Sequence, residues 1–292
     1  MSTVAFWGPV HGQVANTSNL VAASSVLAIE KDVRVMITQT QLAHSTLESA
    51  FLKEQDEGDL LSFSDTGLDA LERLARSKRL TAEKVADYTI PILHNRLELL
   101  LGSARPKNML QDNTNSVLDT IFTVAKKHYD YCFIDVHSGT KNSMTKRVLE
   151  EADMIVVNLN QNIQLLNRFF NKEDWLEALD NKPYVIVLSQ YDPKSQYSVK
   201  NIKRRYNCKQ PILTVPYNTA FRDSCNDRNT IEYFLRATNF SMKRENAFFV
   251  GEIRKLVYEI CNITSKLQQS ENGEASHITD SLLIESATKG AS

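Results

Sequence analysis

The fold of this chain is decided by the stretch Trp7-Gly8-Pro9-Val10-His11-Gly12-Gln13-Val14-Ala15-Asn16-Thr17-Ser18-Asn19. The apolar run Val4–Trp7 leads into it, and a helix is expected to begin near Asn19. A phosphate-binding loop needs small residues here, because backbone N–H groups must point inward ahead of the N-terminus of the helix. Small residues stand at suitable places: Gly12, Ala15, Thr17 and Ser18. The stretch therefore predicts a phosphate-binding loop between a buried strand and a helix.

Short apolar runs alternate with longer stretches of helical period along the rest of the chain. This alternation is typical of a parallel sheet covered by helices on both faces. The runs expected to form strands are Val4–Trp7, Val33–Gln39, Tyr131–Val136, Met154–Leu159, Tyr184–Ser189 and Ile212–Pro216. Their lengths and β-branched residues fit buried parallel strands. The sequence therefore predicts an α/β protein, a three-layer sandwich with a mostly parallel, twisted sheet.

Composition indicates an ordinary globular chain of 292 residues, 42% of them hydrophobic and 24% charged, with a formal net charge of -1. Near-neutral charge gives no overall attraction to nucleic acid or anionic lipid, so any such contact must come from a local patch. No apolar run approaches the ~20 residues of a membrane-spanning helix, and the first residues lack the pattern of a signal peptide. We therefore expect a cytoplasmic protein with reduced cysteines and no transmembrane segment.

Residues 1–268 are expected to form one domain, followed by a flexible C-terminal tail over 269–292. Within the domain, the insertion 67–101 is predicted to be helical, because apolar residues recur there at helical spacing. These residues are Leu68, Leu71, Leu74 and Ala75. Thr81 is expected to cap a second helix of the insertion.

The last helix of the domain is predicted over Ala247–Gln268, where it covers the sheet with an apolar side. That side is expected to contain Phe248, Val250, Ile253, Leu256, Val257 and Ile260. The tail beyond it is rich in Ser, Thr, Glu and Gly, which favours flexibility. Its apolar island Ile278–Ile284 leaves two alternatives open, a docking peptide or plain disorder.

A second motif is Tyr129-Asp130-Tyr131-Cys132-Phe133-Ile134-Asp135-Val136-His137-Ser138-Gly139, an apolar strand that ends in an acid. A carboxylate from Asp135 at the carboxyl edge of the sheet can hold a water of a Mg²⁺ ion. The other ligands of that ion would be the Thr17 hydroxyl and phosphate oxygens. Alternatively, Asp135 only caps the turn that follows. His137 likewise has two interpretations, proton transfer or a structural role.

Three further segments support a family resemblance: Ala152-Asp153-Met154-Ile155-Val156-Val157, Ser189-Gln190-Tyr191-Asp192 and Val215-Pro216-Tyr217-Asn218. Together with the loop and Asp135, they resemble the ParA/MinD group (SIMIBI class) of P-loop ATPases. Within that group the chain is most similar to the TadZ/CpaE proteins of pilus assembly and tight adherence. The resemblance extends from Met1 to about Lys266.

The resemblance implies that the protein binds ATP or ADP with Mg²⁺. The implied nucleotide-binding residues are His11, Gly12, Gln13, Val14, Ala15, Asn16, Thr17 and Ser18 around the phosphates, with Gln190 and Asn218 near the base. Thr17 and Asp135 would serve the metal. The implied partners are a second copy in a nucleotide-dependent homodimer and the proteins of a pilus or secretion system, reached at the membrane or the cell pole.

The loop departs from the family pattern at its charged positions. His11 stands at the signature lysine, Ala15 at the last glycine and Asn16 at the phosphate lysine, so the Walker A loop is degenerate. The second strand ends Ile37-Thr38-Gln39-Thr40-Gln41 and offers no carboxylate. Phosphoryl transfer depends on charge neutralisation and positioning. We therefore expect at most a slow ATPase with no catalytic residue of its own.

Several functions stay open at this point. One alternative is a nucleotide-binding scaffold that localises a pilus or secretion machine. A second is a residual ATPase whose missing cation comes from a partner, and a third is a scaffold that binds no nucleotide. A nucleoid-binding partition protein is a further alternative, because basic residues lie on a predicted helix. These residues are Lys200, Lys203, Arg204, Arg205 and Lys209. An ordinary solvated helix face explains the same residues.

Overall fold

The computed structural model describes residues 1–41, 46–52, 67–103, 114–239 and 244–289. Its centre is an eight-stranded sheet with the order β3-β4-β2-β5-β1-β6-β7-β8. The strands are β1 Ser2–Trp7, β2 Val35–Gln39, β3 Ile90–Leu93, β4 Leu97–Leu99, β5 Tyr131–Asp135, β6 Met154–Leu159, β7 Tyr184–Tyr191 and β8 Ile212–Pro216. Neighbouring strands pair in parallel, except that β3 and β4 form an antiparallel hairpin.

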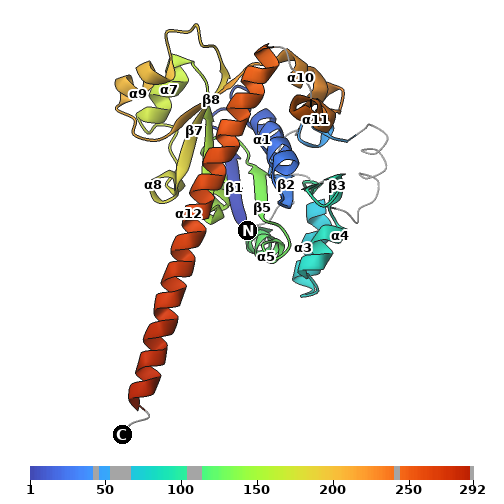
Figure 1. The fold of residues 1–292 in the computed structure, drawn as a ribbon, viewed down its shortest axis with the longest axis vertical. Coiled ribbons are helices and arrows are strands. Elements are labelled where there is room, and N and C mark those ends of the chain that lie inside the picture. The colour runs from blue at the N-terminus through green and yellow to red at the C-terminus, as the bar shows by residue number, and fades with distance from the viewer. Residues whose placement is uncertain (42–45, 53–66, 104–113, 240–243, 290–292) are drawn as a thin grey trace.

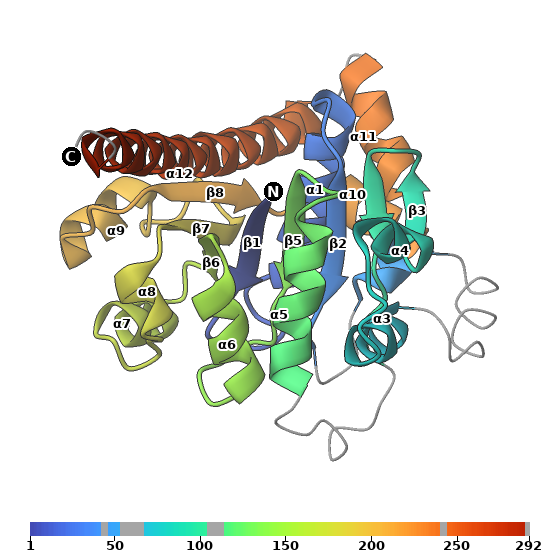
Figure 2. The same ribbon diagram turned by 90° about the horizontal axis from the view of Figure 1, so that it is seen from below.

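Helices cover both faces of this sheet (Figure 1 and Figure 2). The helical elements are α1 Asn16–Glu30, η1 Glu48–Ala50, α3 Gly67–Arg76, α4 Ala82–Asp87, α5 Thr114–Ala125, α6 Ser143–Glu151, α7 Ile163–Phe170, α8 Ala178–Asn181, α9 Val199–Tyr206, α10 Thr219–Asn226, α11 Thr230–Asn239 and α12 Arg244–Lys289. α1, α11 and α12 pack on one face, and α5 and α6 lie on the other (Figure 2). The predicted three-layer α/β sandwich is confirmed.

Side chains alternate between the two faces along the central strand β1. Val4 and Phe6 belong to the core beneath α1 and α12, whereas Ala5 and Trp7 belong to the core beneath α5 and α6. All four side chains are fully buried. A strand covered on both faces has no solvent-facing side, which explains why it reads as a continuous apolar run.

The insertion 67–101 is only partly helical, which corrects the sequence expectation. It contains α3 and α4, with Thr81 at the predicted cap, and then the hairpin β3–β4. β4 joins the main sheet, where Val35 of β2 is in register with Leu97. The two strands have four and three residues, too few to show a period of two beside the stronger helical pattern.

The last helix also differs from expectation. α12 begins at Arg244 and continues to Lys289, through most of the segment expected to be a flexible tail. Extending an existing helix costs much less than starting one, so a polar composition does not by itself end it. Phe248 was expected on the apolar side but is 44% exposed, while its neighbour Phe249 is buried in the core. No helix in the described part of the chain is long and apolar enough to cross a bilayer.

The sheet has a topological switch at β1. β2 and β5 lie on one side of it, and β6, β7 and β8 lie on the other. In open α/β sheets of this kind, ligands bind in the crevice at the carboxyl ends of the strands, beside the switch. The loop that follows Trp7 lies at this place.

Candidate functional site

The loop after β1 is tightly constrained. Gly8 has no room for a side chain, because an added Cβ would lie 2.4 Å from Cγ2 of Val14 and 2.9 Å from the carbonyl oxygen of Asn158. Gly12 has a φ of 72°, in the left-handed region that glycine tolerates. Ala15 adopts φ 50° and ψ 37° without that freedom, and α1 begins at the next residue, three positions before the expected Asn19.

The N-terminus of α1 lacks a side-chain cap among the described residues, and its first turn contains no acidic residue. The first N–H groups of a helix have no partner within the helix. Together with the helix dipole, they attract an anion at this end. The 15 residues of α1 therefore place a partial positive charge below the loop.

The side chain of Asn16 is turned away from this N-terminus and into the protein. Its Nδ2 donates to the backbone oxygen of Phe6 at 2.8 Å and to Oδ1 of Asp135 at 2.7 Å. Its Oδ1 accepts from Nδ2 of Asn158 at 2.5 Å. Asn16 is only 7% exposed. The residue at the position of the phosphate lysine therefore acts as a buried link between β1, β5 and β6.

This link continues through a second asparagine of α1. Nδ2 of Asn19 donates to Oδ1 of Asn158 and to Oγ of Ser189, each at 2.7 Å. The resulting chain runs from β7 through Asn158 and Asn16 to Asp135. No buried side-chain polar atom of these residues lacks a hydrogen-bond partner, and satisfied buried networks of this kind rigidify a structure.

Asp135 ends β5 as predicted and is fully buried. Its Oδ2 accepts from the Thr17 hydroxyl at 2.6 Å, and its Oδ1 accepts from Nδ2 of Asn16 and, at 3.2 Å, from Nε2 of Gln41. Burial raises the pKa of Asp135 to about 6, and the three hydrogen bonds offset part of that rise. The structure thus brings together the two residues predicted to serve Mg²⁺.

The oxygen set suits a magnesium ion in part. Thr17 and Asp135 supply a hydroxyl and a carboxylate, which are hard ligands of the kind Mg²⁺ prefers. In the described part of the chain, no cluster of three His, Cys, Asp or Glu residues is placed to hold a metal. A Mg²⁺ ion here would take its remaining ligands from waters and from the phosphates of a ligand, as is usual for this ion.

His11 of the loop lies near a second histidine, His137, which in turn contacts Gln41. Oε1 of Gln41 lies 3.1 Å from Nδ1 of His137, and Nε2 of Gln41 reaches Asp135. The rings of His11 and His137 are 6.1 Å apart between centroids. Gln41 therefore occupies, with a neutral amide, the place after β2 where the resemblance expects acids.

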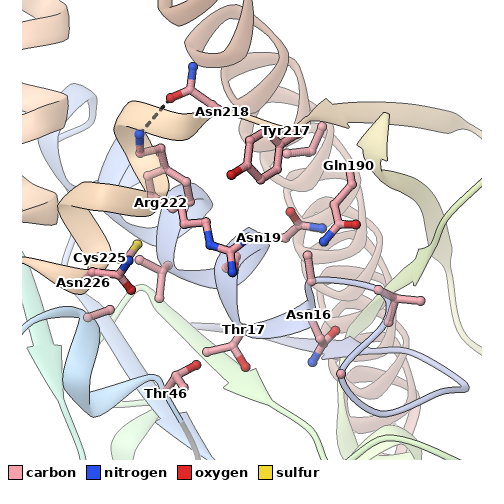
Figure 3. A pocket seen from close by; sticks show the side chains of 18 of the residues that line it. Asn16, Thr17, Asn19, Thr46, Gln190, Tyr217, Asn218, Arg222, Cys225 and Asn226 are labelled. Carbon is pink, nitrogen blue, oxygen red and sulfur yellow. Dashed lines mark hydrogen bonds between the residues drawn. The ribbon is translucent and has the colours of Figure 1, made fainter. Parts of the chain in front are cut away.

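A cavity of 630 Å³ opens above the loop (Figure 3). Small-molecule sites typically have volumes of roughly 300 to 1,000 Å³. The predicted residues that line it are His11, Gly12, Val14, Ala15, Asn16, Thr17, Ser18, Gln190 and Asn218. Gln13 is not among them, and its backbone oxygen accepts a 3.1 Å hydrogen bond from Nδ2 of Asn160. Their roles as nucleotide ligands stay a prediction.

The two predicted base-side residues reach the cavity in different ways. Gln190 lies at an irregularity near the end of β7, with a φ of 52°. Asn218 caps α10, because its Oδ1 accepts from the backbone N–H of Phe221 at 2.8 Å. Its Nδ2 donates to Oδ1 of Asn246 at 2.9 Å, which ties the start of α10 to α12.

Sequence reasoning missed the wall of the cavity that α10 forms. From α10 this wall contains Phe221, Arg222, Cys225 and Asn226, and Tyr217 and Arg228 adjoin it just outside the two ends of the helix. Figure 3 shows Arg222 extending from α10 into the cavity, toward Thr17 and Asn19. The available signal was its spacing, since Arg222 follows the cap Asn218 by four residues, about one helical turn.

α9 confirms the predicted basic helix for four of its five basic residues, whereas Lys209 lies beyond the end of α9 at Tyr206. Lys200, Arg204, Arg205 and Lys209 are exposed, and Lys203 is half-buried. Figure 1 shows α9 at the opposite side of the sheet from α10. None of these five residues lines the loop cavity, so nucleic-acid binding there stays a separate prediction.

Several proteins of known structure resemble this chain. A ParA family ATPase from Chlorobium tepidum has a TM-score of 0.63 at 17% sequence identity, covering 85% of this chain and 96% of its own. A chain of the MinC:MinD cell division protein complex of Aquifex aeolicus has a TM-score of 0.63 at 15% identity, with coverage of 88% and 95%. The septum site-determining protein MinD complexed with Mg-ADP from Pyrococcus horikoshii has 0.61 at 14%, with coverage of 90% and 98%.

No protein-family model matches the sequence, and no curated protein matches it. At identities of 14 to 17% the likeness concerns the backbone and not the function. The likeness covers 85 to 90% of this chain. This chain has the α/β fold of the ParA and MinD P-loop ATPases.

Proposed function

We propose that this protein binds ATP or ADP in the loop cavity, hydrolyses ATP very slowly or not at all, and acts as a localisation or assembly factor. The observation that carries the proposal is the 630 Å³ cavity over the uncapped N-terminus of α1. The loop residues and Thr17 form its floor, and Gln190 and Asn218 lie on the other side. A nucleotide would fit this arrangement, with its phosphates over the N-terminus of α1 and its base near Gln190 and Asn218.

Particular residues would hold the nucleotide and its metal. The backbone N–H groups between Gly12 and Ser18 would contact the phosphates, and Thr17 with Asp135 would hold Mg²⁺. Mg²⁺ would supply charge neutralisation between phosphate oxygens. In support, one solved structure of the same fold is a complex with Mg-ADP.

ATP hydrolysis is disfavoured because the loop lacks the charged groups that stabilise its transition state. Asn16 carries no charge and its amide is held in the buried network. Gln41 replaces a carboxylate after β2. Losing one preorganised donor from a transition state typically costs about 3 kcal/mol, or a factor of about a hundred in rate. Nucleotide binding depends less on these groups than hydrolysis does, so the site would bind ATP without hydrolysing it efficiently.

The cellular role in this proposal comes from the resemblance and the fold. The protein would act in the cytoplasm, as a nucleotide-dependent homodimer that places a pilus or secretion machine at the membrane or the cell pole. Solved proteins of the same fold include a ParA family ATPase and a chain of a MinC:MinD cell division complex. These neighbours support a role in positioning and do not identify the machine.

Calorimetric titration with ATP and Mg²⁺, with free phosphate assayed in the same samples, tests the proposal. We expect saturable binding, little phosphate release over hours, and weaker binding by Thr17→Ala, which removes the hydroxyl beside Asp135. Ser195→Ala, a hydroxyl deletion far along the chain from the loop, serves as the control. Absence of binding up to millimolar ATP would leave a scaffold that acts through protein contacts alone. Rapid phosphate release would establish an ATPase instead.

The exposed cations of α9 favour a second candidate, a nucleoid-binding partition protein. Retardation of duplex DNA without sequence preference tests it. If the helix binds the phosphate backbone, retardation weakens steeply with salt, and Arg204→Glu with Arg205→Glu abolishes it. Lack of retardation at low salt would reject this candidate and leave α9 as a solvated face.

A further inference from the structure

The described lining of the loop cavity contains two arginines and one histidine but no acid. These residues are Arg222, Arg228 and His11. Arginine is always protonated in proteins, so the guanidinium of Arg222 gives the wall of α10 a fixed positive charge. A cavity with one sign of charge in its lining concentrates ligands of the opposite sign. The lining therefore favours an anionic ligand, independently of the shape of the loop.

Arg222 is placed toward the cavity by the packing of α10. Its neighbour Phe221 is buried, in ring contact with Phe249 at 4.9 Å and with Phe234 at 5.6 Å between centroids. The cap Asn218 is bonded to Asn246 of α12. Both contacts fix the orientation of α10, and Figure 3 shows the Arg222 side chain extending over Thr17 as a result.

The Arg222 guanidinium has a neighbour but no ion pair. It lies 6.0 Å from the centre of the Tyr217 ring, which also lines the cavity. In the described part of the chain, Arg222 has no carboxylate partner, and its side chain is exposed. An aromatic face orients a guanidinium without neutralising it, so the charge of Arg222 stays available to a ligand.

This arrangement complements the loss of charge in the loop. Asn16, at the position of the phosphate lysine, is directed into the buried network below the loop. Arg222 reaches the same cavity from the opposite wall, on an element more than 200 residues further along the chain. A planar guanidinium can bind two oxygens of a phosphate at once.

We propose that Arg222 is the cation that binds the phosphate oxygens of the ligand in the loop cavity, in place of a lysine in the loop. The ligand is then an organic polyphosphate held between the N-terminus of α1 and α10. This inference rests on the proposed nucleotide-binding function and adds the residue that supplies its charge. The charged contact to the phosphates then comes from α10 and not from the loop.

The test is calorimetric titration of the full chain with three probes: ATP with Mg²⁺, adenosine, and inorganic tripolyphosphate. The variants are Arg222→Gln, which removes the charge, Arg222→Lys, which keeps it, and Arg79→Gln, at an exposed arginine outside the cavity lining, as the matched control. Circular dichroism confirms that each variant is folded. We expect Arg222→Gln to bind ATP and tripolyphosphate about ten to a hundred times more weakly, with adenosine binding unchanged.

Two further readouts separate a charge contact from a structural role. Added salt should weaken ATP binding to the wild type more than to Arg222→Gln, because salt screens an exposed charge. Arg222→Lys should bind ATP more tightly than Arg222→Gln, and Arg79→Gln should match the wild type.

The outcomes distinguish this inference from the proposed function. ATP binding that is equal in the wild type and Arg222→Gln overturns the role of Arg222 and leaves the nucleotide function standing. If the wild type binds tripolyphosphate but no ATP, and Arg222→Gln loses that binding, the role of Arg222 stands and the nucleotide function falls. If the wild type binds neither probe, both fall.

Discussion

Nδ2 of Asn16 donates a 2.7 Å hydrogen bond to Oδ1 of Asp135, and the Thr17 hydroxyl donates a 2.6 Å bond to the other oxygen of the same carboxylate. The resemblance places a phosphate lysine at the position of Asn16 and the acid that serves the metal at Asp135. Here the two bind each other. The carboxylate is fully buried, so the pair belongs to the framework that holds the loop in shape.

Asn16→Lys, the change that restores the loop lysine, is therefore expected to weaken the protein without restoring turnover. A lysine has no acceptor for Nδ2 of Asn158, and its longer stem must fit where the amide is 7% exposed. Losing these buried bonds should lower the free energy of unfolding by about 1 to 3 kcal/mol. Urea unfolding and phosphate release measure the two effects.

Gln13→Lys is the control for Asn16→Lys, because Gln13 is exposed in the same loop and outside the cavity lining. It adds the same charge without touching the network, so its stability should stay within about 0.5 kcal/mol of the wild type. Wild-type stability of Asn16→Lys together with fast phosphate release would show that the network is dispensable and the site catalytic.

Asn158→Leu tests the centre of the network. Asn158 donates a hydrogen bond to Asn16 and accepts one from Asn19. An apolar residue of similar size leaves the Oδ1 of Asn16 and one N–H of Asn19 buried without that bond. We expect a loss of about 2 to 4 kcal/mol in the free energy of unfolding. Asn160→Ala, which removes two exposed bonds, one to the backbone oxygen of Gln13 and one from the N–H of Asn162, should cost less than about 1 kcal/mol. Equal effects of the two changes would contradict the network.

Much of the fold follows from local pattern. β1 contains the apolar run Val4–Trp7 and β6 contains the apolar run Met154–Val157. Asp135 ends a strand of the same kind, so both the sheet and the acid at its edge are predictable. A parallel strand buried on both faces needs this composition. The position of the loop after β1 follows from the same pattern.

Features that depend on distant contacts are not predictable in this way. The strands β3 and β4 are short, and β4 is defined by pairing with β2, more than 50 residues earlier. Nothing local indicates that the Asn16 amide turns inward, because its partners lie on β1, β5 and β6. Arg222 reaches the loop only after α10 packs on the core. Tertiary context decides each of these features.

Gly8→Ala should disturb the loop more than its small size suggests. The added Cβ would lie 2.4 Å from Cγ2 of Val14 and 2.9 Å from the backbone oxygen of Asn158, so the loop must shift against the network. We expect a loss of about 1 to 3 kcal/mol in the free energy of unfolding and weaker nucleotide binding. Gly251→Ala is the matched control, because apart from the backbone of α12 itself the added Cβ meets nothing within 4 Å. It should stabilise the protein by about 0.5 to 1 kcal/mol, and destabilisation there would contradict the packing of α12.

Asp135 should make stability depend on pH in the sense opposite to that of a surface carboxylate. Burial raises its pKa from 3.8 to about 6, so between these values the folded protein keeps a proton that the unfolded chain releases. The free energy of unfolding then falls as pH rises through this window, by up to about 1.4 kcal/mol per unit. Above the folded pKa the loss is complete and the dependence on Asp135 levels off.

Asp135→Asn, which cannot titrate, isolates this effect. The unfolding free energy of the wild type minus that of the variant should decrease from about pH 4 to about pH 6 and change little above pH 7. Urea unfolding at a series of pH values measures it, with Asp192→Asn at an exposed position as the control for losing a carboxylate. A difference that rises with pH would mean that Asp135 is held ionised by its three donors, and that the framework stabilises its charge more than burial penalises it.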